Sequence, residues 1–152
     1  MAGQALKPLE ILLADDNPGD VRLFIESLKD GKILNHLSVV WDGAEAIAYL
    51  KNKVLTGQAP RPDFIILDIN MPKMTGLEVL QQIKSDLELM SIPVAVLTSS
   101  EAEKDMATSF AYDANCYITK PLDFEKFINA VLSIDSYWLA IVNNTDSQEE
   151  LL

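Results

Sequence analysis

Short apolar runs alternate with longer amphipathic segments along nearly the whole chain. The runs are Leu9–Ala14, Leu37–Trp41, Phe64–Leu67, Pro93–Leu97 and Cys116–Thr119. They lack polar alternation, which is typical of strands buried on both faces of a parallel sheet. Helices are expected at 18–30, from Gly43 through Leu50, from Gly76, at 101–112 and from Asp123. The pattern predicts an α/β fold with five parallel strands and helices on both faces.

Polar residues follow four of the predicted strands where each strand ends. Asp15 and Asp16 follow the first strand, Asp68 the third, Thr98 the fourth and Lys120 the fifth. Ligands of open parallel sheets bind outside the carboxyl ends of the strands, where the strand order reverses. In the order 2-1-3-4-5 the first and third strands are neighbours, so we expect three carboxylates to converge beside a hydroxyl and an ammonium group.

Three adjacent carboxylates repel one another unless a proton or a cation intervenes. Oxygen ligands without histidine or cysteine favour Mg²⁺. A lysine beside such a site favours an anion with several oxygens, such as a phosphoryl group. These residue types suit phosphoryl transfer to an aspartate, with Mg²⁺ and Lys120 offsetting the charge. Taken singly, Asp16 or Asp68 is as readily a helix cap, but matching chemistry at four strand ends favours a site.

The charge balance restricts the classes of partner. The chain has 12 Lys and Arg against 23 Asp and Glu, a net charge of −11, which disfavours nucleic acid and anionic membranes as partners. Its single cysteine, Cys116, allows no internal disulfide and is interpreted as a small buried hydrophobe. No apolar run approaches the roughly 20 residues of a membrane span, and no secretion signal is visible, so we expect a cytoplasmic protein.

With these motifs in this order, the chain resembles the receiver domain of two-component response regulators. The resemblance rests on Asp15-Asp16, on 68–72 with Gly76 after it, on Thr98-Ser99 and on Lys120-Pro121. It implies a flavodoxin-like receiver fold with strand order 2-1-3-4-5. It also implies a protein that is not an enzyme in the usual sense, but a phosphoacceptor with self-catalysed phosphoryl transfer and slow autodephosphorylation.

The resemblance also implies roles for individual residues. Asp68 is implied as the acceptor of a phosphoryl group from a kinase phosphohistidine. Asp16, Asp68 and the backbone carbonyl of Asn70 would bind Mg²⁺, with Asp15 close to metal-bound water, and Lys120 would pair with the phosphoryl oxygens. Thr98 would shift to the phosphoryl group and Tyr117 into the space it leaves, altering the surface of the fourth helix, fifth strand and fifth helix.

Within the family, the chain is most similar to small regulators associated with phytochrome-type histidine kinases. The cues are 16–20, 115–117 before the lysine, and 136–139. We expect an N-terminal arm at 1–8, a receiver domain at 9–142 with an extended last helix, and an acidic tail at 143–152. The stretch after Lys120 has room for little beyond that helix, so output is expected through protein contacts or onward phosphotransfer rather than a DNA-binding domain.

The predicted last helix is apolar over more than half of its circumference, wider than one buried face requires. Exposed apolar surface of that kind usually marks a partner site. We therefore expect a homodimer through Ile134, Tyr137, Trp138 and Ile141. One alternative is that the acidic tail or the preceding helix covers this surface, and another is that the surface is the contact for the kinase or a target.

Other functions remain open at this stage. An aspartate-nucleophile phosphatase of the haloacid-dehalogenase type requires a second aspartate two residues after the nucleophile, where this chain has Asn70. A nucleotide- or flavin-binding module lacks a glycine-rich phosphate loop here. A degenerate receiver that acts as a binding module without phosphorylation is disfavoured by the complete residue set.

Overall fold

The computed structural model describes residues 8–31, 34–110, 112, 114–120 and 125. Its five strands are β1 (Leu9–Ala14), β2 (Asn35–Val40), β3 (Phe64–Asp68), β4 (Val94–Thr98) and β5 (Cys116–Thr119). All neighbouring pairs are parallel, and the order is β2-β1-β3-β4-β5. The predicted fold class and strand order are confirmed.

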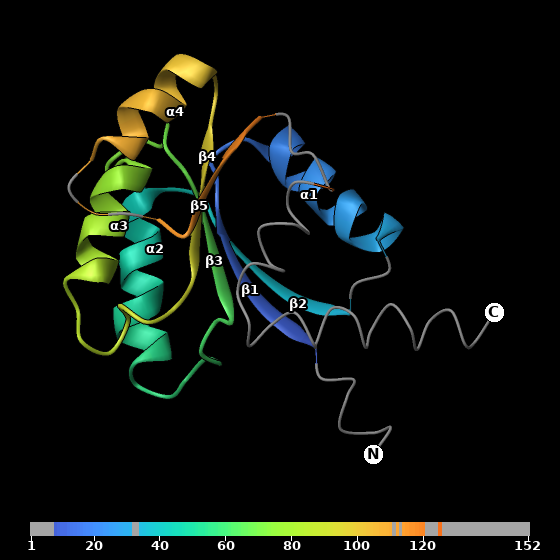
Figure 1. The fold of residues 1–152 in the computed structure, drawn as a ribbon. Helices are drawn as coiled ribbons and strands as arrows, with labels where there is room; N and C mark the ends of the chain where they lie inside the picture. Colours follow the sequence, from blue (N-terminus) through green and yellow to red (C-terminus); the bar gives the residue numbers. More distant parts are fainter. Residues whose placement is uncertain (1–7, 32–33, 111, 113, 121–124, 126–152) are drawn as a thin grey trace.

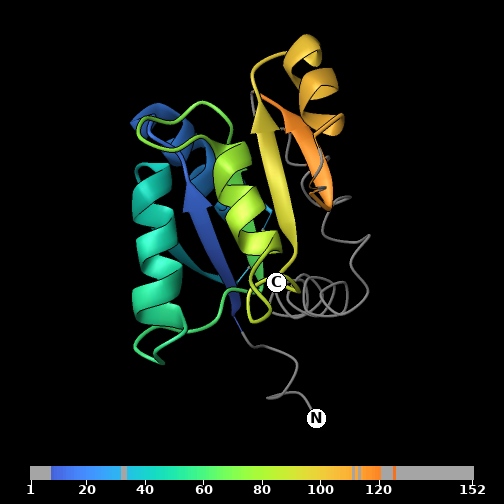
Figure 2. The ribbon, with the colours of Figure 1, turned by 90° about the vertical axis from the view of Figure 1, so that its left-hand side faces the viewer.

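Helices cover both faces of this sheet (Figure 1). On one face lies α1 (Pro18–Asp30), and on the other lie α2 (Gly43–Tyr49), α3 (Gly76–Lys84) and α4 (Glu101–Thr108). The helices α2 and α3 pack side by side, α2 toward the β2 side and α3 over the central strand β3, and α4 lies at the β4–β5 side (Figure 2). No helix among the described residues is long and apolar enough to cross a membrane.

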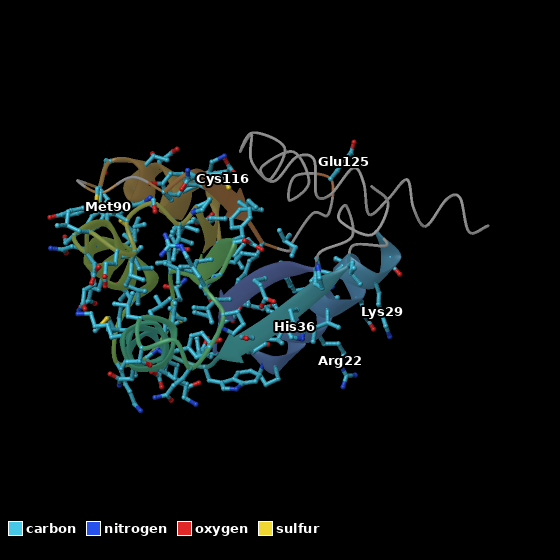
Figure 3. The ribbon with its side chains drawn as sticks, turned by 90° about the horizontal axis from the view of Figure 1, so that it is seen from below. Arg22, Lys29, His36, Met90, Cys116 and Glu125 are labelled. Atoms are coloured by element: carbon cyan, nitrogen blue, oxygen red, sulfur yellow. The ribbon has the colours of Figure 1, made fainter. Side chains whose placement is uncertain are left out.

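Alternate residues of each central strand point to opposite faces, which divides the core into two layers. In β1, Leu12 and Ala14 pack on the α2–α3 side, whereas Ile11 and Leu13 pack on the α1 side. Because both sides are buried, the strand has no polar alternation, as the sequence pattern predicted. Figure 3 labels one residue on each edge strand of the sheet, His36 of β2 and Cys116 of β5.

The first helix begins where its cap residue predicts. The Asn17 side chain accepts hydrogen bonds from the backbone N–H groups of Gly19 and Asp20, and proline occupies the first helical position, where its missing N–H costs nothing. Phe24 and Leu28 on the inner face are buried. These interactions set the start of α1 close to the carboxyl end of β1.

Three elements differ from their predicted bounds by more than one residue, and β3 and β4 differ by single residues at their ends. The second strand begins at Asn35, earlier than predicted. The second helix continues as a π-helix, η2 (Leu50–Val54), in which the N–H of Leu55 donates to the carbonyl of Leu50.

The fourth helix, predicted to reach Tyr112, ends at Thr108. The hydroxyls of Thr108 and Ser109 donate to backbone carbonyls three residues earlier, a competition with the backbone that weakens a helix.

Cys116 is half-buried against the core layer on the α1 side. Burial raises the pKa of its thiol to about 11, so the thiol is uncharged at neutral pH. The interpretation of this cysteine as a packing residue agrees with its position. Apart from Glu125, the predicted last helix and the acidic tail lie outside the described residues.

Candidate functional site

Three aspartates meet at the carboxyl edge of the sheet. Asp15 and Asp16 follow β1, and Asp68 ends β3, the adjacent strand. One carboxylate oxygen from each lies within 4.8 Å of the others. Asp15 and Asp68 are buried, whereas Asp16 is exposed to solvent. The predicted convergence of the three carboxylates is therefore present, and it offers a cation only hard oxygen ligands.

Lys120, directly after β5, extends its ammonium group into this cluster. Its Nζ lies 2.9 Å from Oδ2 of Asp68 and 3.4 Å from Oδ2 of Asp15. It also lies 2.6 Å from Oδ2 of Asp20. Partial burial acts to lower the pKa of Lys120, but the hydrogen bonds to Asp20 and Asp68 outweigh it and hold the pKa above its usual range. The ammonium group is therefore charged at any physiological pH.

The pKa of Asp15 is raised to about 6. Burial is the main cause, and the charge of Asp68 adds to it. The backbone N–H of Asn17, which donates to Oδ1 of Asp15 at 3.0 Å, and the charge of Lys120 act in the opposite direction. Asp15 is thus protonated more readily than an exposed aspartate.

The loop after β3 brings its backbone very close to Asp68. A Cβ atom at Gly76 would overlap the backbone carbonyl oxygen of Asp68, so only glycine fits at this crossing. Thr75 caps α3 in a reciprocal capping box with Glu78. Lys73 adopts a positive φ of 68° at the turn of the loop. These features hold the end of β3 in place.

Asn70 connects this loop to α4 through its side chain. Its Nδ2 donates to Oγ of Ser99 at 3.0 Å and to Oε2 of Glu103 at 2.8 Å, and Glu103 also accepts the backbone N–H of Ser99 at 2.6 Å. The backbone N–H of Asn70 points to Oδ1 of Asp68 at 3.3 Å. Glu103 was not among the predicted site residues. Its position in the first turn of the helix after β4 could have identified it as a residue close to the site.

Thr98 is fully buried at the end of β4. Its hydroxyl donates to Oγ1 of Thr119 at 3.3 Å, the residue paired with it in β5. Thr119 in turn donates to Oε2 of Glu101 at 2.8 Å. The Thr98 hydroxyl is therefore linked to the first turn of α4 through one intervening side chain.

Tyr117 lies two residues before Thr119 and is half-buried against the α2–α3 core layer. Its hydroxyl oxygen accepts the backbone N–H of Ala114 at 3.1 Å. The tyrosine is thus bonded to the loop that precedes its own strand. The predicted interface residues Ile134, Tyr137, Trp138 and Ile141 lie outside the described residues.

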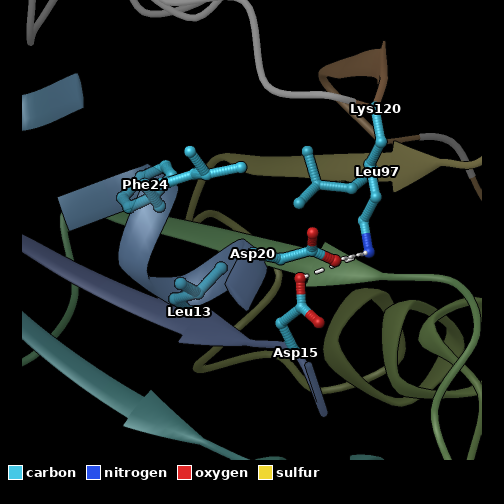
Figure 4. Close-up of a pocket in the computed structure, with 7 residues that line it drawn as sticks. Leu13, Asp15, Asp20, Phe24, Leu97 and Lys120 are labelled. Carbon is cyan, nitrogen blue, oxygen red and sulfur yellow. Dashed lines mark hydrogen bonds and ion pairs between the residues drawn. The ribbon is translucent and has the colours of Figure 1, made fainter. Parts of the chain in front are cut away.

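Asp20, in the sequence only part of the 16–20 segment that marks a subfamily, lies at the site in the structure. Asp20 shares a small pocket with Lys120, Asp15, Leu13 and Leu97 (Figure 4). It stands in the first turn of α1, a helix that begins at the same sheet edge as the acidic cluster. An acidic residue in the first turn of the helix after β1 could therefore have been predicted from the sequence to lie at the site.

Comparison with known proteins decides the family. The sequence profile of the response regulator receiver domain matches residues 11–132. The chain belongs to the response regulator receiver family. This receiver is 39% identical over 142 residues to the response regulator Rcp1 of Synechocystis sp. (strain ATCC 27184 / PCC 6803 / Kazusa), a match that covers 93% of this chain and 97% of Rcp1.

Solved receiver structures agree with this assignment. The bacteriophytochrome response regulator RtBRR matches with a TM-score of 0.77 and 38% identity over 85% of this chain and 79% of its own. The phosphorylated cyanobacterial phytochrome response regulator RcpA matches with a TM-score of 0.69 and 41% identity over 88% and 95%. The Mn²⁺-bound form of Rcp1 matches with a TM-score of 0.68 and 41% identity over 87% and 95%. The receiver thus resembles phytochrome response regulators, and neither a phosphatase nor a degenerate receiver is favoured.

Proposed function

We propose that this receiver accepts a phosphoryl group on Asp68 from a phosphohistidine of a histidine kinase. The observation that carries the proposal is the position of Lys120, whose Nζ contacts Oδ2 of Asp68 at 2.9 Å beside two further carboxylates. A carboxylate oxygen of Asp68 attacks phosphorus as the P–N bond breaks, and the imidazole nitrogen keeps the electron pair of that bond. Lys120 offsets charge on the transferred oxygens.

The acidic cluster suits Mg²⁺ as the cofactor. Its three carboxylates supply only oxygen ligands, and the backbone carbonyl of Asn70 is a further proposed ligand. The Mn²⁺-bound form of the relative Rcp1 supports a divalent cation as the cofactor. When bound, the cation offsets negative charge on the reacting oxygens. Asp16 and Asp68 would hold it, with Asp15 near its water ligands.

The Thr98 hydroxyl is the proposed switch. In this structure it donates to Thr119, so turning toward a phosphoryl group exchanges that bond for one to a charged acceptor. Because Thr119 also bonds Glu101 of α4, the exchange alters the α4–β5 surface. Tyr117 would follow by leaving its bond to the loop before β5.

The proposed kinase partner is of the phytochrome type, since several relatives are phytochrome response regulators. We place the exchange in the cytoplasm and expect output through protein contacts. A homodimer through Ile134, Tyr137, Trp138 and Ile141 is part of the proposal and rests on the sequence pattern.

Incubation with acetyl phosphate and Mg²⁺ followed by intact-mass measurement tests this proposal. The wild-type chain should gain one phosphoryl group, and should lose it slowly by hydrolysis once the donor is removed. Chelation of Mg²⁺ should prevent the gain. If Asp68→Asn gains the same mass to the same extent, the assignment of the phosphoacceptor is wrong.

A further inference from the structure

The side chain of Asp20 makes the shortest of the contacts to Lys120. Oδ2 of Asp20 lies 2.6 Å from the Lys120 Nζ, against 2.9 Å for Asp68 and 3.4 Å for Asp15. Figure 4 shows Asp20 reaching the ammonium group from α1, while Asp15 reaches it from the end of β1. Asp20 is therefore a direct partner of the group that is proposed to bind the phosphoryl oxygens.

This contact is not required to neutralise the lysine. Asp15 and Asp68 still contact the ammonium group if the charge of Asp20 is removed, and Asp16 adds a further negative charge to the cluster. The site thus holds four carboxylates and one lysine. The Asp20 side chain is also 31% exposed, and Lys120 keeps Asp15 and Asp68 as partners when the Asp20 charge is removed.

An incoming phosphoryl group has to share Lys120 with Asp20. An ammonium group has three N–H donors. In this structure Asp20 and Asp68 each accept a hydrogen bond from Lys120, and Asp15 lies at ion-pair distance from it. When a phosphoryl group is attached to Asp68, the Lys120 N–H group that bonds to Asp68 becomes available to the phosphoryl oxygens. The N–H group that bonds to Asp20 does not. The Asp20 charge also repels the added anion across a partly buried site.

We propose that Asp20 is a positioning residue that holds Lys120 in the resting site and thereby lowers the affinity of the receiver for a phosphoryl group at Asp68. The inference rests on the proposed function and adds to it a residue that sets how readily the site accepts the group. The same negative charge strengthens cation binding to the acidic cluster, so Asp20 acts on the two ligands in opposite directions.

Titration calorimetry on wild type and Asp20→Asn tests this, with Mg²⁺ alone and then beryllofluoride at saturating Mg²⁺. We expect Asp20→Asn to bind beryllofluoride about threefold to fivefold more tightly, the size of a partly exposed charge interaction. We expect it to bind Mg²⁺ alone more weakly, because a negative charge is lost and Lys120 turns fully to Asp15 and Asp68. A general structural defect would weaken both affinities.

Two further variants separate the charge from its position. Asp20→Glu keeps the carboxylate and should restore both affinities toward those of wild type. Glu26→Gln removes one exposed charge from the same helix, about 9 Å further along its axis, and should change neither.

The inference is overturned if Asp20→Asn leaves the beryllofluoride affinity unchanged or lowers it, or if its Mg²⁺ affinity does not fall. It is equally overturned if Glu26→Gln reproduces both changes of Asp20→Asn. If the wild-type chain does not bind beryllofluoride, the assignment of Asp68 as the phosphoacceptor is wrong. If the wild-type chain binds it and Asp20→Asn binds it equally well, only the role of Asp20 is wrong.

Discussion

At the scale of single residues, burial and charge act on the carboxylates of the site unequally. Asp15 is buried and Asp16 is exposed, although they are adjacent in the chain. A buried carboxyl group beside other acids is costly to ionise, so ionisation of Asp15 destabilises the fold. The exposed Asp16 retains its hydration and is accessible to a cation.

The titration of Asp15 should make the stability of the metal-free protein depend on pH. Its folded pKa of about 6 lies above the ordinary value of 3.8, so between these values the folded state binds more protons than the unfolded state. The free energy of unfolding should therefore fall as pH rises through this window, by at most about 3 kcal/mol. Urea unfolding from pH 4 to 7 in the presence of a chelator measures it. A slope that persists unchanged in Asp15→Asn would show that another group is responsible.

Asp16→Ala should weaken Mg²⁺ binding, because it removes one of the three clustered carboxylate ligands. It should also raise the melting temperature of the metal-free protein by relieving repulsion between like charges. Calorimetric titration and thermal unfolding measure the two effects. Asp30→Ala, which removes an exposed acid from the far end of α1, is the matched control. An unchanged Mg²⁺ affinity in Asp16→Ala would remove this residue from the ligand set.

At the scale of elements, the site depends on how closely the β3–α3 loop approaches the end of β3. Gly76 packs its Cα against the backbone of Asp68 and Ile69. The capping box of Thr75 then sets the start of α3. Even a small displacement of this loop would move the Asp68 carboxylate relative to Lys120. Reactivity is sensitive to the distance between such groups.

Gly76→Ala should lower the free energy of unfolding by about 1–3 kcal/mol, because the added methyl group overlaps the Asp68 backbone. It should also slow phosphorylation by acetyl phosphate. Gly57→Ala is the matched control. Gly57 has a φ of 82°, and an added Cβ there would meet open space, so backbone strain lowers stability without touching the site. Denaturant unfolding and intact-mass kinetics give the comparison. Equal phosphorylation rates in both variants would contradict this role of the loop.

At the scale of the whole molecule, the sheet order joins the parts of the site. The β1 and β3 strands are neighbours although α1, β2, α2 and η2 separate them in the chain. Because all five strands are parallel, the carboxyl ends of β1, β3, β4 and β5 gather at one edge, while the connecting helices cover both faces (Figure 1). In the proposed switch, a signal formed at that edge reaches other molecules through the α4–β5 surface.

The homodimer proposal belongs to this scale. Light scattering at several protein concentrations should detect a dimer, and Tyr137→Asp combined with Ile141→Asp should abolish it by placing charges in an apolar interface. Leu87→Asp with Met90→Asp adds the same charges at exposed apolar residues between α3 and β4 and should leave the dimer intact. A strict monomer with and without beryllofluoride, or a dimer indifferent to the first pair, would contradict this interface.

The sequence alone determined the strands, the strand-end residues and the family, because short-range patterns carry that information. The uninterrupted apolar run Ile11–Ala14 within the first strand predicts burial on both faces, and Asn17-Pro18 specifies where α1 begins. Parallel strands with helical crossovers must then collect Asp15, Asp68 and Lys120 at one edge. These features follow from local chemistry and a small set of permitted connections.

Only the tertiary structure decided which side chains share Lys120 and which are bonded elsewhere. The 2.6 Å contact from Asp20 and the link from Asn70 to Glu103 join residues on different elements. The bond of Tyr117 to Ala114 likewise depends on how the loop before β5 folds back. Such contacts are set by helix positions and side-chain rotamers, which depend on packing across the whole fold. The sequence therefore predicted the composition of the site, and three-dimensional packing determined its connections.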